Sequence, residues 1–315
     1  MISFLKKLKD SFLFSLKLKR LTKINSKFVI LKIFLIRTFF SYPCIRNLIK
    51  TKKGKNFLSD NFFEKKTSSN SVVSNLDKKG FDNHSLTSKV TNSIIEEIPS
   101  LVQNISLKGR KQNKIDTSKF YCKSLSDFKE FTLKNRISHI KMDLNLEKNS
   151  NLKNFVLSDF AIDIAQSYLN SRTFTVSAVI FISNPLDGGI KDEELSDNAQ
   201  KFHTDINYTK FFKVLIYLND VNDENGPHIF IPGSHKKKKR KHYKIERYED
   251  EDIFKNYNQK IKFIGKKGTI FYEDTFGFHK GDEPKSNSRI ALIIEYGKNN
   301  IKYGNYSEFV SSKIS

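Results

Sequence analysis

The 315-residue sequence contains only two cysteines, Cys44 and Cys122, and no tryptophan. Two cysteines so far apart indicate neither a disulfide framework nor a metal site built from several thiolates, which suits a reducing cytoplasm. Of the 56 Lys and Arg residues only nine are Arg, and this bias, with the missing tryptophan, points to an AT-rich coding sequence. A single lysine is therefore weak evidence of function.

Long uncharged apolar runs are also missing. The best candidate, residues 28–40, is 13 residues long and contains Lys32 and Arg37, whereas a bilayer core needs roughly 20 apolar residues. No small-residue cleavage site follows it, which argues against a secretory signal. We expect a cytoplasmic protein that is soluble or membrane-associated at the periphery.

Acidic residues are scarce, and the net charge is +22. Residues 1–56 hold fifteen Lys and Arg against one acid, Asp10, and so contribute +14 of this charge. Within 1–24, apolar residues recur every three or four positions between lysines, which predicts a basic amphipathic helix. Such a helix could contact an anionic membrane, pack on the rest of the protein or be poorly ordered. The segment lacks the pattern of aromatic and Gly residues found in nucleic-acid modules, so we expect no nucleic-acid partner.

The composition divides the chain into three parts. Residues 1–56 form the basic amphipathic extension, which we expect to be separable from catalysis. Residues 57–75, rich in Ser, Asn and Lys, are predicted to be a weakly ordered linker. Residues 76–315 form the main domain, with its core at 157–296 and an early helix at 86–98 stopped by Pro99.

The pattern of the core predicts a mainly β fold. A helix is expected at 158–170, because Ser158 and Asp159 are good N-caps before an apolar face. The runs that follow are short, β-branched or aromatic, and separated by turn residues such as Asn225 and Gly226. They lie at 173–182, 211–218, 228–231, 269–272 and 290–296. We expect a double-stranded β-helix (a jelly roll, cupin-like) with flanking α-helices.

Two separated motifs suggest a metal site in this core. In the sequence QKFHTD at 200–205, His203 and Asp205 are two residues apart, so on an extended segment they point to the same side. His279, in a later strand, supplies a third ligand. Two imidazoles and one carboxylate form the facial triad that leaves half of an iron coordination sphere open.

From about residue 157 to 296 the chain resembles the phytanoyl-CoA dioxygenase family of iron(II)- and 2-oxoglutarate-dependent oxygenases. The matching segments are FAIDIAQSYL (160–169), QKFHTD (200–205), KVLIYLNDVNDENGPHIFIPGSHK (213–236) and GTIFYEDTFGFHKG (268–281), followed by Arg289. The resemblance implies Fe(II), 2-oxoglutarate as co-substrate and O2. It also implies hydroxylation of an unidentified small or lipid-like substrate, with release of succinate and CO2.

Several residues acquire roles from this interpretation. Arg289 opens a core strand, and a buried guanidinium needs an anion, so we assign it to the distal carboxylate of 2-oxoglutarate. Thr275 and Tyr217 are further candidates for contacts with the co-substrate. Asp205 favours hydroxylation, because halogenating enzymes of this architecture carry a small residue in place of the carboxylate.

Other polar residues are assigned structural roles or none. Asp274 is expected to orient the turn before His279, and His235 to close a hairpin. Four histidines are not assigned to the site: His84, His139, His228 and His242. The basic run KKKKRK at 236–241 could recruit an anionic substrate or pair with the acidic residues that follow it.

Two alternatives stay open. One is a cupin-type metal enzyme that does not use 2-oxoglutarate, against which Arg289 argues. The other is a non-catalytic peripheral membrane or nucleic-acid-binding module, which the intact set of His203, Asp205 and His279 makes less favoured.

Overall fold

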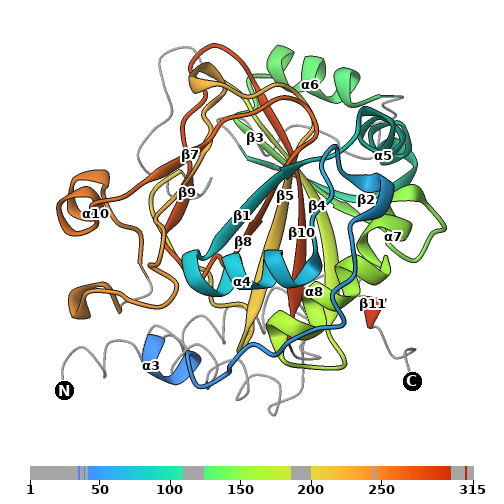
Figure 1. Cartoon of the computed structure of the whole chain (residues 1–315). Helices are drawn as coiled ribbons and strands as arrows, with labels where there is room; N and C mark the ends of the chain where they lie inside the picture. The colour runs from blue at the N-terminus through green and yellow to red at the C-terminus, as the bar shows by residue number, and fades with distance from the viewer. Residues whose placement is uncertain are drawn as a thin grey trace.

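The computed structural model describes residues 35, 39, 42–108, 124–185, 200–243, 246–298 and 309–310. Its strands form two antiparallel sheets that pack against each other (Figure 1). The large sheet has the order β1-β8-β5-β10-β4-β3-β2 with β11 beside β4, and the small one has the order β7-β6-β9. The strands are β1 (Phe81–Ser85), β2 (Val102–Lys108), β3 (His139–Leu144), β4 (Thr175–Ser183), β5 (Phe211–Tyr217), β6 (His228–Phe230), β7 (Ile261–Phe263), β8 (Thr269–Glu273), β9 (His279–Gly281), β10 (Arg289–Gly297) and β11 (Phe309–Val310). The predicted double-stranded β-helix is confirmed.

Alternation along the central strands explains how the large sheet is covered on both faces. Val214 and Ile216 of β5 belong to the main core cluster that includes buried residues of the helices. Leu215 and Tyr217, from the same strand, belong to a second cluster with Phe230 of the small sheet. Successive side chains of a strand point to opposite faces, so one apolar run serves both layers.

The helices pack mainly on the outer face of the large sheet (Figure 1). They are α3 (Pro43–Arg46), α4 (Ser69–Lys79), α5 (Ser88–Leu101), α6 (Leu125–Lys134), α7 (Asn151–Val156), α8 (Asp159–Leu169) and α10 (Asp250–Asn256), with 3-10 turns at Asp60–Phe62, Asp223–Asn225 and Arg240–Tyr243. Helix α8 matches the expected helix at 158–170, since the Ser158 side chain caps it by accepting a hydrogen bond from the Ala161 N–H.

Helix α4 differs from the predicted linker at 57–75. Ser68 caps the helix, which then buries Val72, Val73 and Leu76 in the main core. The Ser- and Asn-rich composition hid an apolar spacing of one and three residues, which places these side chains on one face. This part of the chain therefore belongs to the folded domain.

The predicted stop at Pro99 was also inexact. Helix α5 begins after the Thr87 cap and runs to Leu101, with Pro99 inside it. A proline removes a single N–H and disfavours the helical conformation of the residue before it, but two more residues follow before the chain enters β2.

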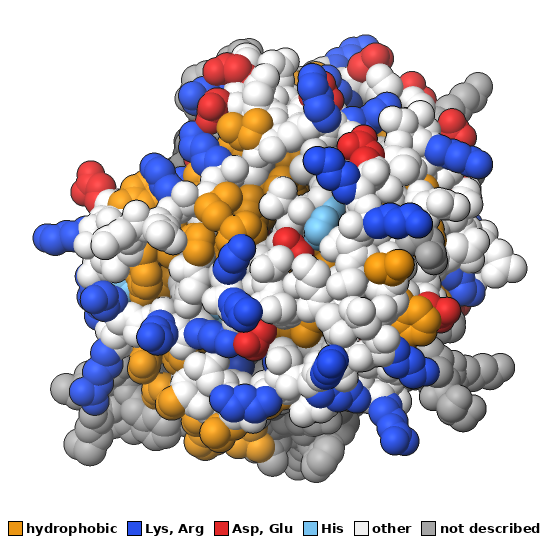
Figure 2. Space-filling model, viewed as in Figure 1, with side chains coloured by type: hydrophobic (Ala, Val, Ile, Leu, Met, Phe, Trp, Pro, Cys, Tyr) orange, Lys and Arg blue, Asp and Glu red, His pale blue; other side chains and the backbone are white. Residues whose placement is uncertain are grey.

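The extension predicted for 1–56 is not separate along its whole length. Helix α3 places Arg46 with only 4% of its side chain exposed, and both of its terminal nitrogens bind Asp274, at 2.7 and 2.8 Å. The amphipathic helix predicted for 1–24 lies outside the described residues. No helix within the described residues is long and apolar enough to cross a membrane. Lys and Arg side chains are spread over the face shown in Figure 2 and are not gathered in one patch.

Candidate metal centre

The three predicted ligands come from two segments that the backbone joins directly. His203 precedes β5 and forms an isolated antiparallel bridge with His279 at the start of β9. Its N–H donates to the His279 carbonyl at 3.0 Å, and the His279 N–H donates back at 3.1 Å. The Asp205 N–H donates to the Thr275 carbonyl at 2.9 Å. The His-X-Asp segment is therefore held against the segment that carries the second histidine.

The side chains converge on one point. One ligand atom from each of His203, Asp205 and His279 lies within 4.8 Å of the others. Nε2 of His279 is 3.3 Å from Oδ2 of Asp205, and Nε2 of His203 is 3.9 Å from Oδ1. The Nδ1 atoms face backbone carbonyls instead, at 2.9 Å for His203 and 3.0 Å for His279. Such contacts fix the tautomer with a proton on Nδ1 and leave each Nε2 free to bind a metal.

The electrostatics favour the ligating protonation states. Burial, together with the neighbouring His279, holds the pKa of His203 well below its usual value, so its imidazole is neutral. Burial alone would raise the pKa of Asp205, but the charge of Lys213 and the close contact with His279 lower it well below its ordinary value. A neutral imidazole and an ionised carboxylate are the forms that bind a divalent cation.

A cavity of about 260 Å³ contains the three side chains. Its wall combines polar groups with apolar residues of the inner sheet face. The other lining residues are His139, Phe181, Lys213, Leu215, His228, Arg247, Glu273, Thr275, Gly281, Arg289, Ala291 and Ile293. The set of two imidazoles and one carboxylate fits an iron(II) ion with open coordination positions.

Arg289 lies in the wall of this cavity and is 8% exposed. Nη1 has no hydrogen-bond partner in the protein, and Nη2 lies 3.4 Å from the Ser183 hydroxyl. Burial lowers its pKa, and no carboxylate among the described residues forms an ion pair with it. Gly281 allows this close approach, because a Cβ at that position would collide with Nη2. The guanidinium is thus poised for an anion inside the cavity.

Of the two other predicted co-substrate residues, only Thr275 lines the cavity. Its buried hydroxyl has no hydrogen-bond partner. Tyr217 is not among the described residues that line it. Its hydroxyl donates to the Phe263 carbonyl at 2.6 Å and accepts from the His228 N–H at 3.1 Å. Both hydrogen-bonding roles of Tyr217 therefore serve the join between the sheets, so the suggested co-substrate contact does not fit.

Four charged or titratable groups in or near the cavity were not predicted. Lys213 donates to Oδ2 of Asp205 at 2.7 Å and lies 3.5 Å from Glu295. His228 and Glu273 approach to 2.8 Å, and the ring of His228 stacks 5.6 Å from that of His279. The available signal was a charge within an apolar strand: Lys213 interrupts FFKVLIY, and Glu273 ends TIFYE.

The remaining predicted positions lie outside the cavity, except for two of the four unassigned histidines, His139 and His228. Asp274 accepts a hydrogen bond from the Phe276 N–H at 3.1 Å, which agrees with its expected role in the turn. The 236–241 run does not line the cavity; Lys236 pairs with Asp77, and Lys241 with Asp252. His84 and His242 likewise pair with carboxylates. His139 does line the cavity, contrary to expectation.

The sequence model of the phytanoyl-CoA dioxygenase family matches residues 120–288, more than half of the chain. The chain belongs to this family. The matched range contains His203, Asp205 and His279 and ends one residue before Arg289. A search of curated protein sequences found no match.

Several solved structures are similar in fold. The α-ketoglutarate-dependent epimerase SnoN from nogalamycin biosynthesis has a TM-score of 0.48 and 10% identity, with 73% of this chain and 80% of that one covered. EctD from S. alaskensis with bound Fe has a TM-score of 0.47 and 11% identity, covering 83% and 91%. HygX from Streptomyces hygroscopicus, with nickel, 2-oxoglutarate and hygromycin B bound, has a TM-score of 0.47 and 12% identity, covering 74% and 88%. Similarities this distant do not decide the reaction or the substrate.

As a member of this family, the protein is an iron(II)- and 2-oxoglutarate-dependent oxygenase that uses O2. The cavity fits that cofactor set on its own chemistry. It contains three side chains that could hold a metal ion, and two buried groups, Arg289 Nη1 and the Thr275 hydroxyl, have no protein partner.

Proposed function

We propose that the protein hydroxylates a C–H bond of a small or lipid-like molecule at the cavity that contains His203, Asp205 and His279. In this reaction one oxygen atom of O2 enters the substrate as a hydroxyl group, and the other enters succinate as 2-oxoglutarate loses CO2. The observation that carries the proposal is the convergence of two Nε2 atoms and one carboxylate on a single point.

Each residue has a distinct task in this proposal. His203, Asp205 and His279 would hold the iron, and Arg289 would bind the distal carboxylate of 2-oxoglutarate through its fork of N–H donors. The Thr275 hydroxyl would add a hydrogen bond to the same molecule. When bound, iron(II) supplies the activation of O2 that couples loss of CO2 to oxidation of the substrate.

The rest of the cavity would orient the substrate and exclude water. Phe181, Leu215 and Ile293 provide apolar surface in its wall, which suits a C–H bond as the target. The carboxylate of Asp205 supports hydroxylation over halogenation, since it takes the coordination position that a halide would need.

Iron-dependent conversion of 2-oxoglutarate to succinate tests the proposal. We expect the anaerobically reconstituted protein to release succinate when O2 is admitted, and His203→Ala, Asp205→Ala or His279→Ala to lose both iron binding and turnover. The chain offers a matched control on β1, where Asp82 and His84 are also two residues apart and 3.0 Å from each other. His84→Ala should keep iron and turnover. No succinate from the wild type, with iron bound, would refute the proposed oxygenase reaction.

Substrate screening then tests hydroxylation itself. Candidate small molecules and lipids are added, and products are examined by mass spectrometry for a gain of one oxygen atom. If the products were instead epimerised, cyclised or halogenated, the proposed hydroxylation would be wrong, but the assignment to the oxygenase class would still hold.

A further inference from the structure

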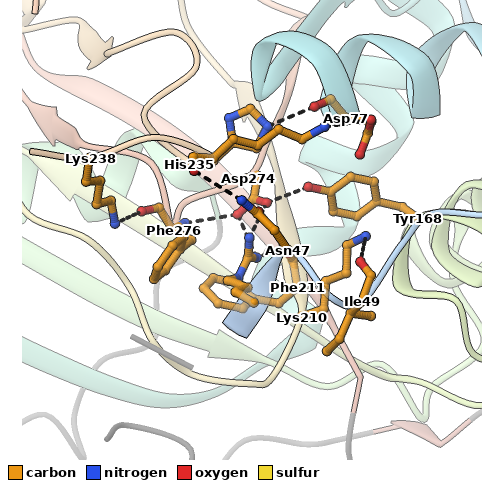
Figure 3. A network of polar contacts seen from close by, with 12 residues as sticks. Asn47, Ile49, Asp77, Tyr168, Lys210, Phe211, His235, Lys238, Asp274 and Phe276 are labelled. Atoms are coloured by element: carbon orange, nitrogen blue, oxygen red, sulfur yellow. Dashed lines mark hydrogen bonds and ion pairs between the residues drawn. The ribbon is translucent and has the colours of Figure 1, made fainter. Parts of the chain in front are cut away.

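A second cavity of about 260 Å³ lies between the N-terminal segment and the rest of the domain (Figure 3). The segment reaches it just after α3, where Asn47 donates to the Lys236 carbonyl at 3.1 Å and Ile49 accepts from Lys210 at 3.0 Å. α8 contributes Tyr168, and the turn after β8 contributes Asp274. None of its described lining residues is shared with the metal cavity.

The lining of this second cavity carries more positive than negative charge. Its bases are Arg46, Lys50, Lys210 and Lys236, and its acids are Asp77 and Asp274. Both acids are already paired inside the protein: Asp274 with Arg46 at 2.7 Å, and Asp77 with Lys236 at 2.7 Å. Lys50 and Lys210 are left without a carboxylate among the described residues.

The donors on the floor of the cavity are incompletely used. Lys210 is only 4% exposed, and its amine, which can donate three hydrogen bonds, donates one to the Ile49 carbonyl. Its amine also lies 4.4 Å from the Tyr168 ring centre. Arg46, 4% exposed, has a buried Nε with no hydrogen-bond partner. Lys50 is exposed at the rim of the cavity, where its flexible side chain can reach a bound ligand.

We propose that this cavity binds a phosphate-type oxyanion, carried either by a soluble phosphomonoester or by a lipid headgroup. Lys50 and Lys210 supply the uncompensated charge, and Thr51 supplies a hydroxyl in the wall. A tetrahedral oxyanion accepts several hydrogen bonds at once, which matches clustered ammonium groups around a concave surface. The site goes beyond the oxygenase reaction and does not depend on it.

The protonation of Lys210 supports this proposal. Burial, reinforced by the charge of Arg46, lowers its pKa to about 7. Asp274 and Asp77 act in the opposite direction, and Lys236 acts in the same direction as Arg46. Two further titratable side chains of the wall, His235 and Tyr168, stay neutral above pH 7, because burial lowers the pKa of His235 and raises that of Tyr168. A bound oxyanion would raise the pKa of Lys210, so that Lys210 takes up a proton when the oxyanion binds. The affinity for the oxyanion should therefore fall as the pH rises through about 7 and above.

Isothermal titration of the full-length protein tests the site. The probes are inorganic phosphate, sulfate and, for the lipid source, vesicles with and without phosphatidic acid. We expect Lys50→Gln and Lys210→Gln each to weaken phosphate binding by about tenfold. Lys89→Gln is the control, because Lys89 is equally basic, exposed on α5 and absent from the cavity. Sulfate does not titrate near neutrality, so any pH dependence of its binding reports on the protein. We expect the wild type to bind sulfate more weakly at about pH 9 than at about pH 6, and Lys210→Gln to lose this difference.

The outcomes separate cleanly. Sensitivity to Lys50 and Lys210 with inorganic phosphate identifies a soluble ligand, whereas the same sensitivity seen with phosphatidic acid vesicles alone identifies a headgroup. Equal weakening by all three variants, or no binding of any probe to the wild type, would overturn the proposal. Exposed Lys50 can be replaced without disturbing the core, so Lys50→Gln remains decisive even if Lys210→Gln fails to fold.

Discussion

Arg289 shows at the scale of one residue how a buried group can await a ligand. Its Nη1 atom has no protein partner, and its closest polar contact is the neutral hydroxyl of Ser183. Folding has already removed this guanidinium from water. A carboxylate that binds to it therefore does not have to offset that part of the desolvation cost. This is the expected behaviour of a co-substrate site.

We expect Arg289→Lys to weaken 2-oxoglutarate binding, because a point charge cannot reproduce the two parallel hydrogen bonds of the fork. Arg289→Ala should weaken it further, by about 2 to 5 kcal/mol. The measurement is titration of 2-oxoglutarate into the anaerobic iron complex, followed by its metal-to-ligand absorption band. Iron should still bind, and the exposed Arg172→Ala should leave the affinity unchanged. An unaltered dissociation constant in Arg289→Ala would move the cupin-type alternative to first place.

Lys213 is the second residue with a testable role. It is the cation nearest to Asp205 and also approaches Glu295. In Lys213→Met the metal-free protein keeps these carboxylates without their cation, so its free energy of unfolding should fall by up to about 3 kcal/mol. A bound divalent ion would replace part of the lost charge, so the loss should be smaller with Mn²⁺ present. Urea unfolding with and without Mn²⁺ measures both values. The same loss in both states would show that Lys213 does not balance the metal ligand.

The sequence predicted His203, Asp205, Arg289 and Thr275 because their motifs are local, with fixed spacing in the chain. It also assigned Tyr217 to the co-substrate, where the structure does not place it, because the direction of a strand side chain depends on which layer covers each face. Lys213 was not predicted, because a single lysine is not distinctive in a chain rich in lysine. Only the folded strand places it 2.7 Å from Asp205.

At the scale of elements, the turn between β8 and β9 joins the two cavities. Asp274 faces the second cavity, where it binds Arg46 and accepts a hydrogen bond from Tyr168. The next residue, Thr275, faces the metal cavity and holds the backbone of Asp205. Helix α3 therefore supports the outer side of a turn whose inner side orders Asp205.

Lys210, which directly precedes β5, gives this region a pH-dependent stability. Its folded pKa of about 7 lies below its ordinary value of 10.5, so the folded state binds fewer protons than the unfolded state between these values. Stability should consequently rise with pH across this range, and the cost of burying the charge is fully present below about pH 7.

We expect Lys210→Met to raise the free energy of unfolding more at about pH 6 than at about pH 10, with at most about 1.4 kcal/mol of change per pH unit between them. Loss of the hydrogen bond to Ile49 adds an offset that does not depend on pH, so only the difference between the two conditions is informative. Urea unfolding at both values supplies it, with Lys89→Met as the exposed control. An identical effect at both pH values would mean that Lys210 keeps an ordinary pKa.

At the scale of the whole molecule, the strands of the core could be predicted because each is a short apolar run between turn residues. Strands β1, β2, β3, β7 and β11 were missed. Segments such as FDNHS in β1 lack a clear alternation and gain their structure from pairing with neighbours. The contribution of α3 and α4 was also missed, because their buried residues are few and lie far in sequence from what they contact. Arg46 and Asp274 are 228 residues apart.

These long-range contacts revise the expectation that residues 1–56 can be removed without consequence. Removing 1–56 takes away Arg46 and leaves Asp274 buried without its cation, which should cost about 3 to 5 kcal/mol of stability. It also removes the N–H groups of Lys55 and Asn56 that bind Asp163 at 2.8 and 3.1 Å. Removing only 1–41 spares all of these contacts while deleting ten of the fifteen basic residues of the extension.

We therefore expect the 1–41 deletion to retain the unfolding midpoint and succinate release of the full chain, and the 1–56 deletion to lower both. Arg46→Met in the full chain should reproduce most of the loss of stability, which separates the ion pair from the length of the segment. If residues 1–41 contact anionic membranes, the 1–41 deletion alone should already reduce co-sedimentation with anionic vesicles, because it removes ten of the fifteen basic residues of the extension. Full stability and turnover in the 1–56 deletion would show that α3 is dispensable and would restore the domain boundary at residue 56.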